Sequence, residues 1–257
     1  RPVTATAAYY DVLAWRPGKQ LVYSLLSGID FTLWQSQADG RAPQQLIPQP
    51  GGYNYPAVAP DGQRLVLTAR QNGKARLLVR DPAGQLRPLL ELDCLYPSVA
   101  PDGATVYFQF HPQGGAAEIW RVPLAGGDPV KVTEGNYPAI SPDGKWLAYW
   151  YDDTAARRSL LAIKDLAGNA PTQFFKVSNG YPALRWLPDG SGVAFLTANE
   201  IRYQPLSGGA AKLLLKVESG ELFSFDFSPD GQQVAYIAGH VTSNVLLLSD
   251  LQALMTP

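Results

Sequence analysis

Cysteine and histidine are scarce in this chain, and their scarcity excludes several kinds of site. Cys94 is the single cysteine among 257 residues, so it has no partner for an internal disulfide. Neither His111 nor His240 has a ligand spacing such as HExxH around it, and a metal site normally needs three or more converging ligands. A phosphate-binding loop and a Gly-x-Ser-x-Gly motif are also missing. We therefore expect no metal, no other cofactor and no catalytic constellation.

Charge and long hydrophobic runs are also scarce. The net charge of −1 gives no electrostatic reason to bind nucleic acid. The longest apolar stretches are far shorter than the roughly 20 residues that cross a bilayer, so we expect no membrane span. The hydrophobic content of 46% is typical of a packed globular protein, which we expect to be monomeric as an isolated domain. The chain begins at Arg1 without a signal-like segment, which we interpret as a processed product or a domain of a longer protein.

A short turn motif, Pro-Asp-Gly, recurs at a regular interval. Its aspartates are separated by 41, 41, 46 and 41 residues: Asp61, Asp102, Asp143, Asp189 and Asp230. A degenerate copy lies upstream in "AWRPGKQLVY", where Pro17 is followed directly by Gly18. Proline, aspartate and glycine each favour one position of a tight hairpin turn. Because a catalytic acid is needed only once, we interpret the repeated aspartates as structural.

Each copy of the turn is flanked by segments rich in β-forming residues. A short extended segment such as "YPAIS" precedes the turn, and runs such as "WLAYWY" and "SLLAIKDL" follow it. Four antiparallel strands in about 40 residues match the period of a β-propeller blade and not that of a helical repeat.

We therefore predict an all-β fold, a six-bladed β-propeller of four-stranded antiparallel blades in which residues 1–257 form a single domain. The blades are expected at residues 9–50, 51–92, 93–135, 136–179, 180–220 and 221–257. The last unit has only "QALMTP" left for its fourth strand. Residues 1–8 are therefore expected to supply the outer strand of the final blade and so to close the ring.

The repeat resembles a known family. With "YPAISPDGKWLAYW", "EIWRVPLAGG" and "VKVTEG" in one unit, almost the whole chain looks like the TolB-type propeller repeats of bacterial proteins. Residues 219–251 are similar to the end of the C-terminal propellers attached to bacterial serine/threonine kinases and winged-helix transcriptional regulators. The resemblance implies a sensor or interaction module and carries no catalytic residue onto this sequence. The chain departs from the pattern in its first unit, which lacks the Asp, in its lengthened fourth unit, and in "FSFDFS", which replaces Tyr-Pro in the last.

Aromatic residues recur at the entry to the innermost strand of each unit. They are Tyr10, Tyr55, Tyr96, Tyr137, Tyr181 and Phe223. One interpretation is a belt around the mouth of a central channel, able to hold a ligand by stacking. The other is packing between blades, which recurs because the blade recurs.

Two acids, Asp11 and Asp226, also lie on predicted innermost strands. Propeller enzymes that act on sugars or lactones place carboxylates around the channel, where they act in pairs or hold a cation. The simpler interpretation is that Asp226 is a solvated residue of the channel wall.

Two functions follow from these patterns. The first is a non-enzymatic sensor or protein-interaction module of a bacterial signalling or regulatory protein, which binds a protein or a small-molecule ligand at the channel mouth or the loop face. The alternative is a small hydrolase or lyase that acts on a sugar or lactone through channel carboxylates. A periplasmic or other extracytoplasmic location is favoured, with the cytoplasm left open.

Overall fold

The structure is a computed structural model, and it describes residues 10–49, 51–71, 73–177 and 183–239. Within these ranges there is no helix of the length and hydrophobicity that a membrane span requires. The strands are β1 Tyr10–Arg16, β2 Gln20–Ser27, β3 Asp30–Gln37, β4 Gln44–Gln45, β5 Gly52–Val58, β6 Leu65–Gln71, β7 Lys74–Arg80, β8 Leu86–Leu90, β9 Cys94–Val99, β10 Thr105–Phe110, β11 Glu118–Pro123, β12 Val130–Glu134, β13 Asn136–Ile140, β14 Trp146–Asp153, β15 Arg158–Asp165, β16 Gln173–Phe175, β17 Leu184–Trp186, β18 Gly192–Leu196, β19 Glu200–Pro205, β20 Lys212–Lys216, β21 Glu221–Phe227 and β22 Val234–Gly239.

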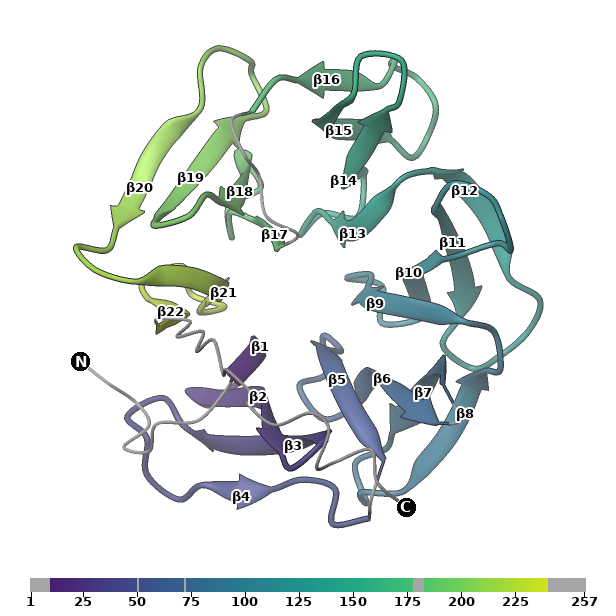
Figure 1. Cartoon of the computed structure of the whole chain (residues 1–257), viewed down its shortest axis with the longest axis vertical. Coiled ribbons are helices and arrows are strands. Elements are labelled where there is room, and N and C mark those ends of the chain that lie inside the picture. Colours follow the sequence, from purple (N-terminus) through teal and green to yellow (C-terminus); the bar gives the residue numbers. More distant parts are fainter. Residues whose placement is uncertain (1–9, 50, 72, 178–182, 240–257) are drawn as a thin grey trace, which may run out of the picture.

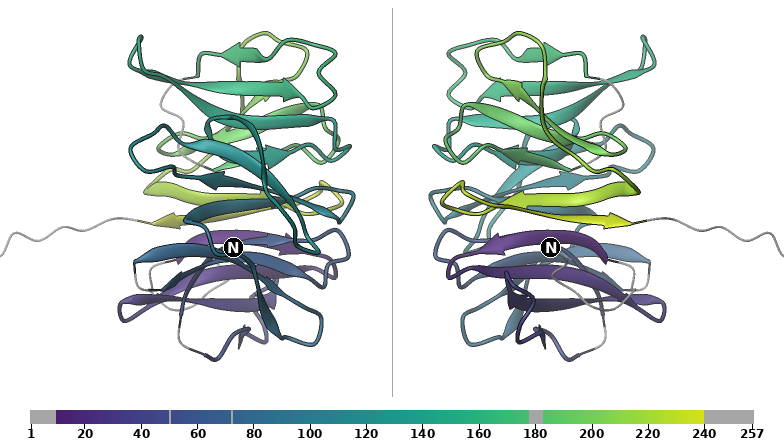
Figure 2. Two further views of the ribbon diagram at one scale, coloured as in Figure 1. Left: turned by 90° about the vertical axis from the view of Figure 1, so that its right-hand side faces the viewer. Right: turned by 90° about the vertical axis from the view of Figure 1, so that its left-hand side faces the viewer.

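The strands form antiparallel sheets in chain order around a central axis (Figure 1). Strands β1–β4 make blade 1, β5–β8 blade 2, β9–β12 blade 3, β13–β16 blade 4 and β17–β20 blade 5, while β21 and β22 pair with each other. The first strand of each blade lies nearest the axis. In the side views the strands cross the short dimension of the molecule, and the connecting turns lie on its two flat faces (Figure 2). The β-propeller prediction is confirmed.

The predicted number of blades and the predicted closure are wrong. The described residues form five four-stranded blades, and between blades 5 and 1 they form the two-stranded sheet β21–β22. Residues 1–8, expected to close the ring as an added strand, lie outside the described residues. The joint is made instead by side chains of β21, because Ser224 Oγ accepts the N–H of Leu13 at 3.2 Å and Asp226 Oδ2 accepts the N–H of Trp15 at 2.7 Å. Both bonds bring β21 directly against β1.

The hydrophobic core lies between neighbouring blades. One buried cluster joins Val66 of blade 2 to Val106 and Phe108 of blade 3. Another joins Trp150 of blade 4 to Phe195 of blade 5, with ring centroids 6.1 Å apart in an edge-to-face arrangement. Because each blade covers the face of the next, no blade has its core to itself.

The repeated aspartates hold the turns in which they lie. Asp102 Oδ1 accepts the backbone N–H groups of Ala104 and Thr105 at 2.8 and 2.9 Å. The other four aspartates each accept a backbone N–H two residues ahead in the same way: Asp61, Asp143, Asp189 and Asp230. These contacts give the repeated aspartates a structural role, as the repetition suggested.

The turns also contact one another from blade to blade. In four joints, the turn glycine of one unit lies against the turn proline of the unit before it: Pro17 and Gly62, Pro60 and Gly103, Pro101 and Gly144, Pro188 and Gly231. At the first joint, a Cβ on Gly62 would lie 2.7 Å from Pro17 Cγ, and the glycine has φ +67°. Glycine is therefore required there both by the close approach and by the left-handed backbone.

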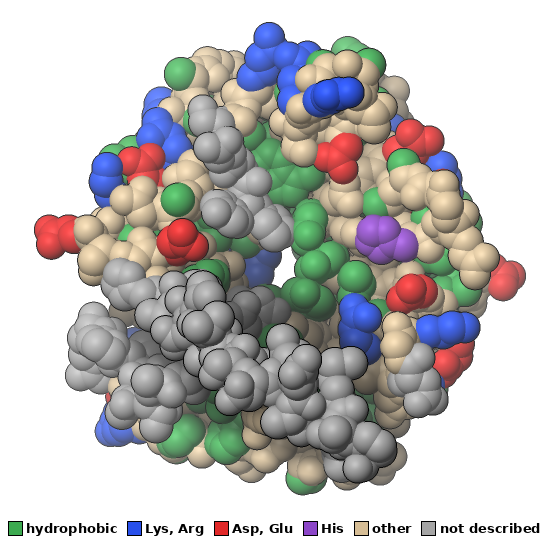
Figure 3. Space-filling view, viewed as in Figure 1, with side chains coloured by type: hydrophobic (Ala, Val, Ile, Leu, Met, Phe, Trp, Pro, Cys, Tyr) green, Lys and Arg blue, Asp and Glu red, His purple; other side chains and the backbone are tan. Residues whose placement is uncertain are grey.

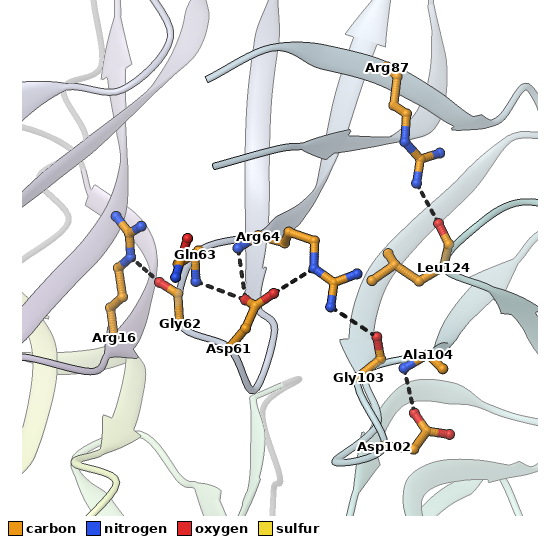
Figure 4. A network of polar contacts seen from close by, with 10 residues as sticks. All are labelled: Arg16, Asp61, Gly62, Gln63, Arg64, Arg87, Asp102, Gly103, Ala104 and Leu124. Atoms are coloured by element: carbon orange, nitrogen blue, oxygen red, sulfur yellow. Dashed lines mark hydrogen bonds and ion pairs between the residues drawn. The ribbon is translucent and has the colours of Figure 1, made fainter. Parts of the chain in front are cut away.

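Arginines reinforce two of these joints (Figure 4). Arg16 of blade 1 donates from Nε to the carbonyl oxygen of Gly62 in blade 2, at 2.5 Å. Arg64 pairs with the carboxylate of Asp61 in its own turn and donates from Nη2 to the carbonyl oxygen of Gly103 in blade 3, at 3.3 Å. On the turn face, neighbouring blades are thus joined by hydrogen bonds from arginine to carbonyl oxygens as well as by apolar contacts between turns.

The joint between blades 4 and 5 is different. Nothing lies within 4 Å of a Cβ on Gly190, so the turn contact with Pro142 is missing. A groove of about 1190 Å³ opens between these blades, lined by Phe174, Phe195 and Arg202 among others. The joint follows the lengthened fourth unit, whose extra residues separate the two blades further along the chain.

Candidate functional site

The repeated tyrosines lie in β-bulges of the innermost strands. The pairing of β5 with β6 shifts between Asn54 and Ala57, and β9 and β13 show similar shifts. The bulged residues Tyr55, Tyr96 and Tyr137 have φ values of 50°, 52° and 53°. Bulges with one left-handed residue usually place glycine there, and the proline that follows each tyrosine restricts it further. Because a left-handed backbone costs a residue with a Cβ about 1–2 kcal/mol, strain is repeated in three successive blades.

These three side chains form a continuous stack, which we call the aromatic wall. The ring centroids of Tyr55 and Tyr96 are 4.2 Å apart, as are those of Tyr96 and Tyr137, with interplanar angles of 53° and 50°. Tyr96 Oη donates to Tyr55 Oη at 3.3 Å. All three side chains are half-buried. The space-filling view shows hydrophobic side chains along the rim of a central opening, on the side where β5, β9 and β13 lie (Figure 3).

Polar side chains support the strained backbone of the aromatic wall. Asn54 Oδ1 accepts the N–H of Tyr55 at 2.8 Å, and Gln109 Oε1 accepts the N–H of Tyr137 at 3.0 Å. Gln109 is buried in β10 of the preceding blade, and its amide nitrogen contacts Nε2 of His111. Since a backbone N–H can only donate, the Gln109 oxygen must face Tyr137 and its NH₂ group must face the imidazole.

Charged residues lie on the other side of the opening, on the innermost strands of blade 5 and of the two-stranded sheet. Arg185 Nε is 3.3 Å from Asp226 Oδ1, and Arg185 Nη2 donates to the carbonyl oxygen of Leu13 at 3.4 Å. We call Arg185, Ser224 and Asp226 the polar wall. Through these side chains β17, β21 and β1, each from a different sheet, are linked to one another.

Asp226 is held inside this joint. Its side chain is 20% exposed, and its carboxylate accepts the N–H groups of Trp15 and Phe227 as well as contacting Arg185. Burial raises the pKa of Asp226 above its ordinary value, and Arg185 with the Trp15 N–H opposes that effect only in part. Asp226, interpreted from the sequence as a solvated residue of the channel wall, is partly exposed, and its carboxylate also bridges neighbouring sheets.

The repeat explains this position of Asp226. The residues three before the turn proline of each unit are Ala14, Ala57, Ser98, Ala139, Arg185 and Asp226. Ser98 Oγ accepts the N–H of Ile140 in the next blade at 3.2 Å, as Asp226 accepts that of Trp15. The indoles of Trp15 and Trp186 likewise donate to the carbonyl oxygens of Asp226 and Ala139 at this same register. A side chain at this position can thus join blades without being a ligand group.

The sequence did not point to Arg185 or to Gln109. Arg185 carries a detectable signal, because it is the one basic residue at a register otherwise occupied by alanine, serine and aspartate. Gln109 carries none, since nothing in "TVYFQF" shows that it reaches the backbone of the next blade.

The remaining predicted residues divide between described and undescribed parts. Tyr10 pairs through its backbone with Leu25 at the start of β1, whereas its side chain, that of Asp11 and the whole of Tyr181 lie outside the description. Phe223 is half-buried at a pairing shift in β21, and Ser224 takes the register that tyrosine has in blades 2 to 4. Three of the six aromatics are therefore seen to stack.

Residues that could hold a metal or act as a nucleophile are not gathered in the described ranges. There, no group of three or more His, Cys, Asp and Glu side chains converges in a way that could hold a metal ion. Cys94 is fully buried, and this burial raises the pKa of its thiol to about 12. The thiol is thus protonated at neutral pH and poorly reactive.

No protein-family model matches this sequence, and no curated protein is similar to it. Solved structures of the same fold do exist. A protein assigned as TolB from Agrobacterium tumefaciens superposes with a TM-score of 0.77 at 18% identity, covering 93% of this chain and 94% of that one. TolB from Acinetobacter baumannii gives a TM-score of 0.71 at 21% identity over 85% of this chain, and the match spans only 58% of that longer protein.

An enzyme is also among the similar structures. The gluconolactonase XC5397 from Xanthomonas campestris gives a TM-score of 0.70 at 18% identity, covering 92% of this chain and 85% of that one. At these identities the likeness shows a TolB-like propeller fold, which propellers of unrelated function share.

Proposed function

We propose that this chain is a non-enzymatic binding module of a bacterial signalling or regulatory protein, and that it takes a protein segment or a small ligand at the mouth of its central channel. The observation that supports this proposal is the aromatic wall. Left-handed backbone at a bulky residue persists only where its surroundings enforce it, and such strain is concentrated at ligand sites. The proposal includes a monomeric domain that works in the periplasm or elsewhere outside the cytoplasm.

The chemistry of the aromatic wall favours an extended partner. Tyr55, Tyr96 and Tyr137 offer three successive rings at 4.2 Å spacing, each from a different blade. Tyrosine gives a large contact area at a low cost in side-chain entropy. A segment that runs along the rim can therefore contact all three rings, whereas a compact ligand contacts one or two.

The second candidate is a small propeller hydrolase. The gluconolactonase fold and the raised pKa of Asp226 favour it, because catalytic acids often have a shifted pKa. The contacts of Asp226 favour the binding module, since its carboxylate is already engaged by Arg185, Trp15 and Phe227. We therefore place the enzyme second.

A selection of short random peptides displayed on phage tests the binding module. We expect wild-type protein to enrich peptides whose affinity falls at least tenfold in the variant Tyr96→Ala. Tyr236→Ala is the matched control, because Tyr236 is 44% exposed on β22 and lies away from the aromatic wall. Enriched peptides that bind Tyr96→Ala as well as wild type would contradict the proposal.

Hydrolysis of gluconolactone separates the two candidates. The binding module predicts no turnover above the uncatalysed rate in wild-type protein. The enzyme predicts turnover that is abolished in Asp226→Ala and in the more conservative Asp226→Asn.

A further inference from the structure

Two arginines that have no acidic ion-pair partner among the described residues lie at the joint of blades 1 and 2, on the turn face at the far end of the innermost strands from the aromatic wall. Arg16 ends β1 and Arg80 ends β7. Both are half-buried. Arg80 pairs across the sheet with Leu65, which follows closely after the turn containing Gly62. Arg16 donates to the carbonyl oxygen of Gly62 in blade 2. Arg80 shares a face of β7 with Leu78, which packs against the buried cluster shared by blades 1 and 2, so both side chains lie at the same joint, which we call the notch.

No other joint of the repeat combines two cations at these registers. The residues equivalent to Arg16, immediately before the turn proline, are Ala59, Ala100, Ser141, Leu187 and Ser228. The residues equivalent to Arg80 in the sheet pairing are Ser36, Val122, Lys164 and Gln204. The pair is therefore a departure from the repeat and not a requirement of its geometry.

Arg16 keeps part of its hydrogen-bonding capacity free. Its Nε and Nη1 donate to neutral oxygens, the carbonyl of Gly62 and Oε1 of Gln35, the latter at 2.9 Å. Within the described part of the chain, its Nη2 makes no hydrogen bond and its charge has no carboxylate within ion-pair distance. Figure 4 shows the two terminal nitrogens of Arg16 turned away from the Gly62 carbonyl.

Arg80 is less satisfied still. Its Nε is buried and has no hydrogen-bond partner among the described residues. The nearest acid in sequence, Asp81, is engaged by the N–H of Gln85 at 2.8 Å. Burial lowers the pKa of Arg80, and the charge of Arg16 lowers it further, while Asp81 acts in the opposite direction. A half-buried cation with a second cation nearby and a donor that has no acceptor is costly unless an anion compensates it.

We propose that the notch formed by Arg16 and Arg80 binds a phosphate group. A guanidinium presents parallel N–H donors in a planar fork that matches the oxygens of a phosphate. Arg80 supplies such a fork, and Nη2 of Arg16 adds a further charged donor. The phosphate group neutralises the repulsion between the two arginines. It is carried either by free inorganic phosphate or by a phosphate monoester on a larger molecule.

Thermal unfolding of the whole chain tests the site, with inorganic phosphate as the probe and sodium chloride of equal ionic strength as the reference. We expect phosphate at roughly a hundred times its Kd to raise the Tm of the wild type by about 5 °C. Arg80→Met should lose this response, and its Tm in chloride should equal or exceed that of the wild type, because a half-buried cation without an ion-pair partner among the described residues is removed. A merely structural Arg80 predicts the opposite change in chloride, a lower Tm.

Lys164→Met is the matched control, because Lys164 has the same register in blade 4 and is also half-buried, but faces no second cation at the position of Arg16. It should keep the phosphate response in full. An equal loss of response in Lys164→Met, or no response in the wild type, overturns the proposal. Arg80→Lys, which keeps the charge and loses the fork, should weaken phosphate binding at least threefold, and broadening of the phosphorus NMR signal of phosphate by wild-type protein gives a second readout that needs no variant.

The source of the phosphate is distinguished by a second ligand, N-acetyl-phosphoserine amide. Tighter binding of this ester than of inorganic phosphate supports a phosphorylated partner, and the reverse supports the free ion. Loss of peptide binding in Tyr96→Ala with an intact phosphate response would leave this site standing, because the two sites share no residue.

Discussion

The aromatic wall and the polar wall are both built on the innermost strands of the same repeat, yet they hold their blades together by different means. In blades 2 to 4, bulged tyrosines stack across the joints at 4.2 Å while small residues follow them deeper in the channel. In blade 5 and the two-stranded sheet, Arg185 and Asp226 take those deeper positions and join three sheets by ionic and hydrogen bonds. The difference shows that the repeat determines where a side chain lies but not which kind of interaction it makes.

Removing the acid of the polar wall should have the largest effect. Asp226→Ala removes the carboxylate that faces the charge of Arg185 and accepts the N–H of Trp15, and breaking such a pair costs about 3 kcal/mol where the groups are mostly buried. Asp226→Asn should lose clearly less, because the amide oxygen still accepts the Trp15 N–H. Urea unfolding measures both. An Asp226→Ala protein as stable as wild type would remove the distinction between the two walls.

Removing a side chain that accepts a tyrosine N–H of the aromatic wall should have the second-largest effect on stability. Gln109→Leu removes the Gln109 oxygen that accepts the partly buried N–H of Tyr137, at a cost of about 2 kcal/mol in unfolding free energy. It should also weaken peptide binding, because Tyr137 loses its fixed position. Asn54→Ala is the matched variant at Tyr55. If Gln109→Leu lowers stability but leaves binding untouched, the aromatic wall is packing between blades and not a binding surface.

The strain in the aromatic wall can be isolated by two substitutions at one position. Tyr96→Ala and Tyr96→Gly both remove the ring, but only glycine relieves the left-handed backbone, so the glycine variant should be more stable by about 1 kcal/mol. Peptide binding should fall equally in both variants. Equal stabilities in chemical unfolding would show that the bulge relaxes when the ring is absent.

Substitution of a turn aspartate should have the smallest effect on stability, and this effect should depend on pH. The Ser141 hydroxyl and the Lys145 N–H lower the pKa of Asp143, and the Ser228 hydroxyl and the Gln232 N–H lower that of Asp230. A folded-state pKa below the unfolded value of about 4 means that this stabilisation is complete above about pH 5 and is lost as the pH falls through the folded-state pKa.

Asp143→Asn tests this dependence. Its Tm should be lower than that of the wild type by about 1 °C at pH 7, with the difference shrinking as the pH approaches 3. The contribution of Asp226 to stability should depend on pH in the opposite direction, because folding raises the pKa of this residue. The contribution is complete below the pKa of the unfolded state and is lost as the pH rises through the pKa of the folded state. A difference for Asp143→Asn that grows in acid would contradict the structural role of the turn carboxylates.

The sequence predicted the propeller well because the information about a blade is local. The interval of the Pro-Asp-Gly turns and the β-rich runs on either side of them lie within one unit, and the structure places its hairpins there. The blade count and the closure depend on how the first and last units meet. That joint rests on two contacts, Leu13 with Ser224 and Trp15 with Asp226, each between residues 211 apart in sequence.

The candidate site was predicted only in part, for the same reason. Tyr55, Tyr96 and Tyr137 were found because they repeat, but their left-handed backbone was not, since tyrosine before proline normally favours extended backbone. Asp226 was placed on an innermost strand, but its ion pair with Arg185 was not predicted. The two residues become partners only when blade 5 and the two-stranded sheet lie side by side. Contacts across blades are properties of the ring and not of the unit.

The contact of a turn glycine with the turn proline of the preceding unit, which is made at four joints, has a consequence for how such a chain can have arisen. A single Pro-Asp-Gly turn carries both halves of the joint, the proline for the unit that follows it and the glycine for the unit before it. When a gene segment encoding one whole unit is copied in tandem, the new blade arrives with a matching contact on each side and needs no compensating change in its neighbours. Lengthening within a unit, as between blades 4 and 5, instead breaks the match and leaves a gap that later substitutions can shape.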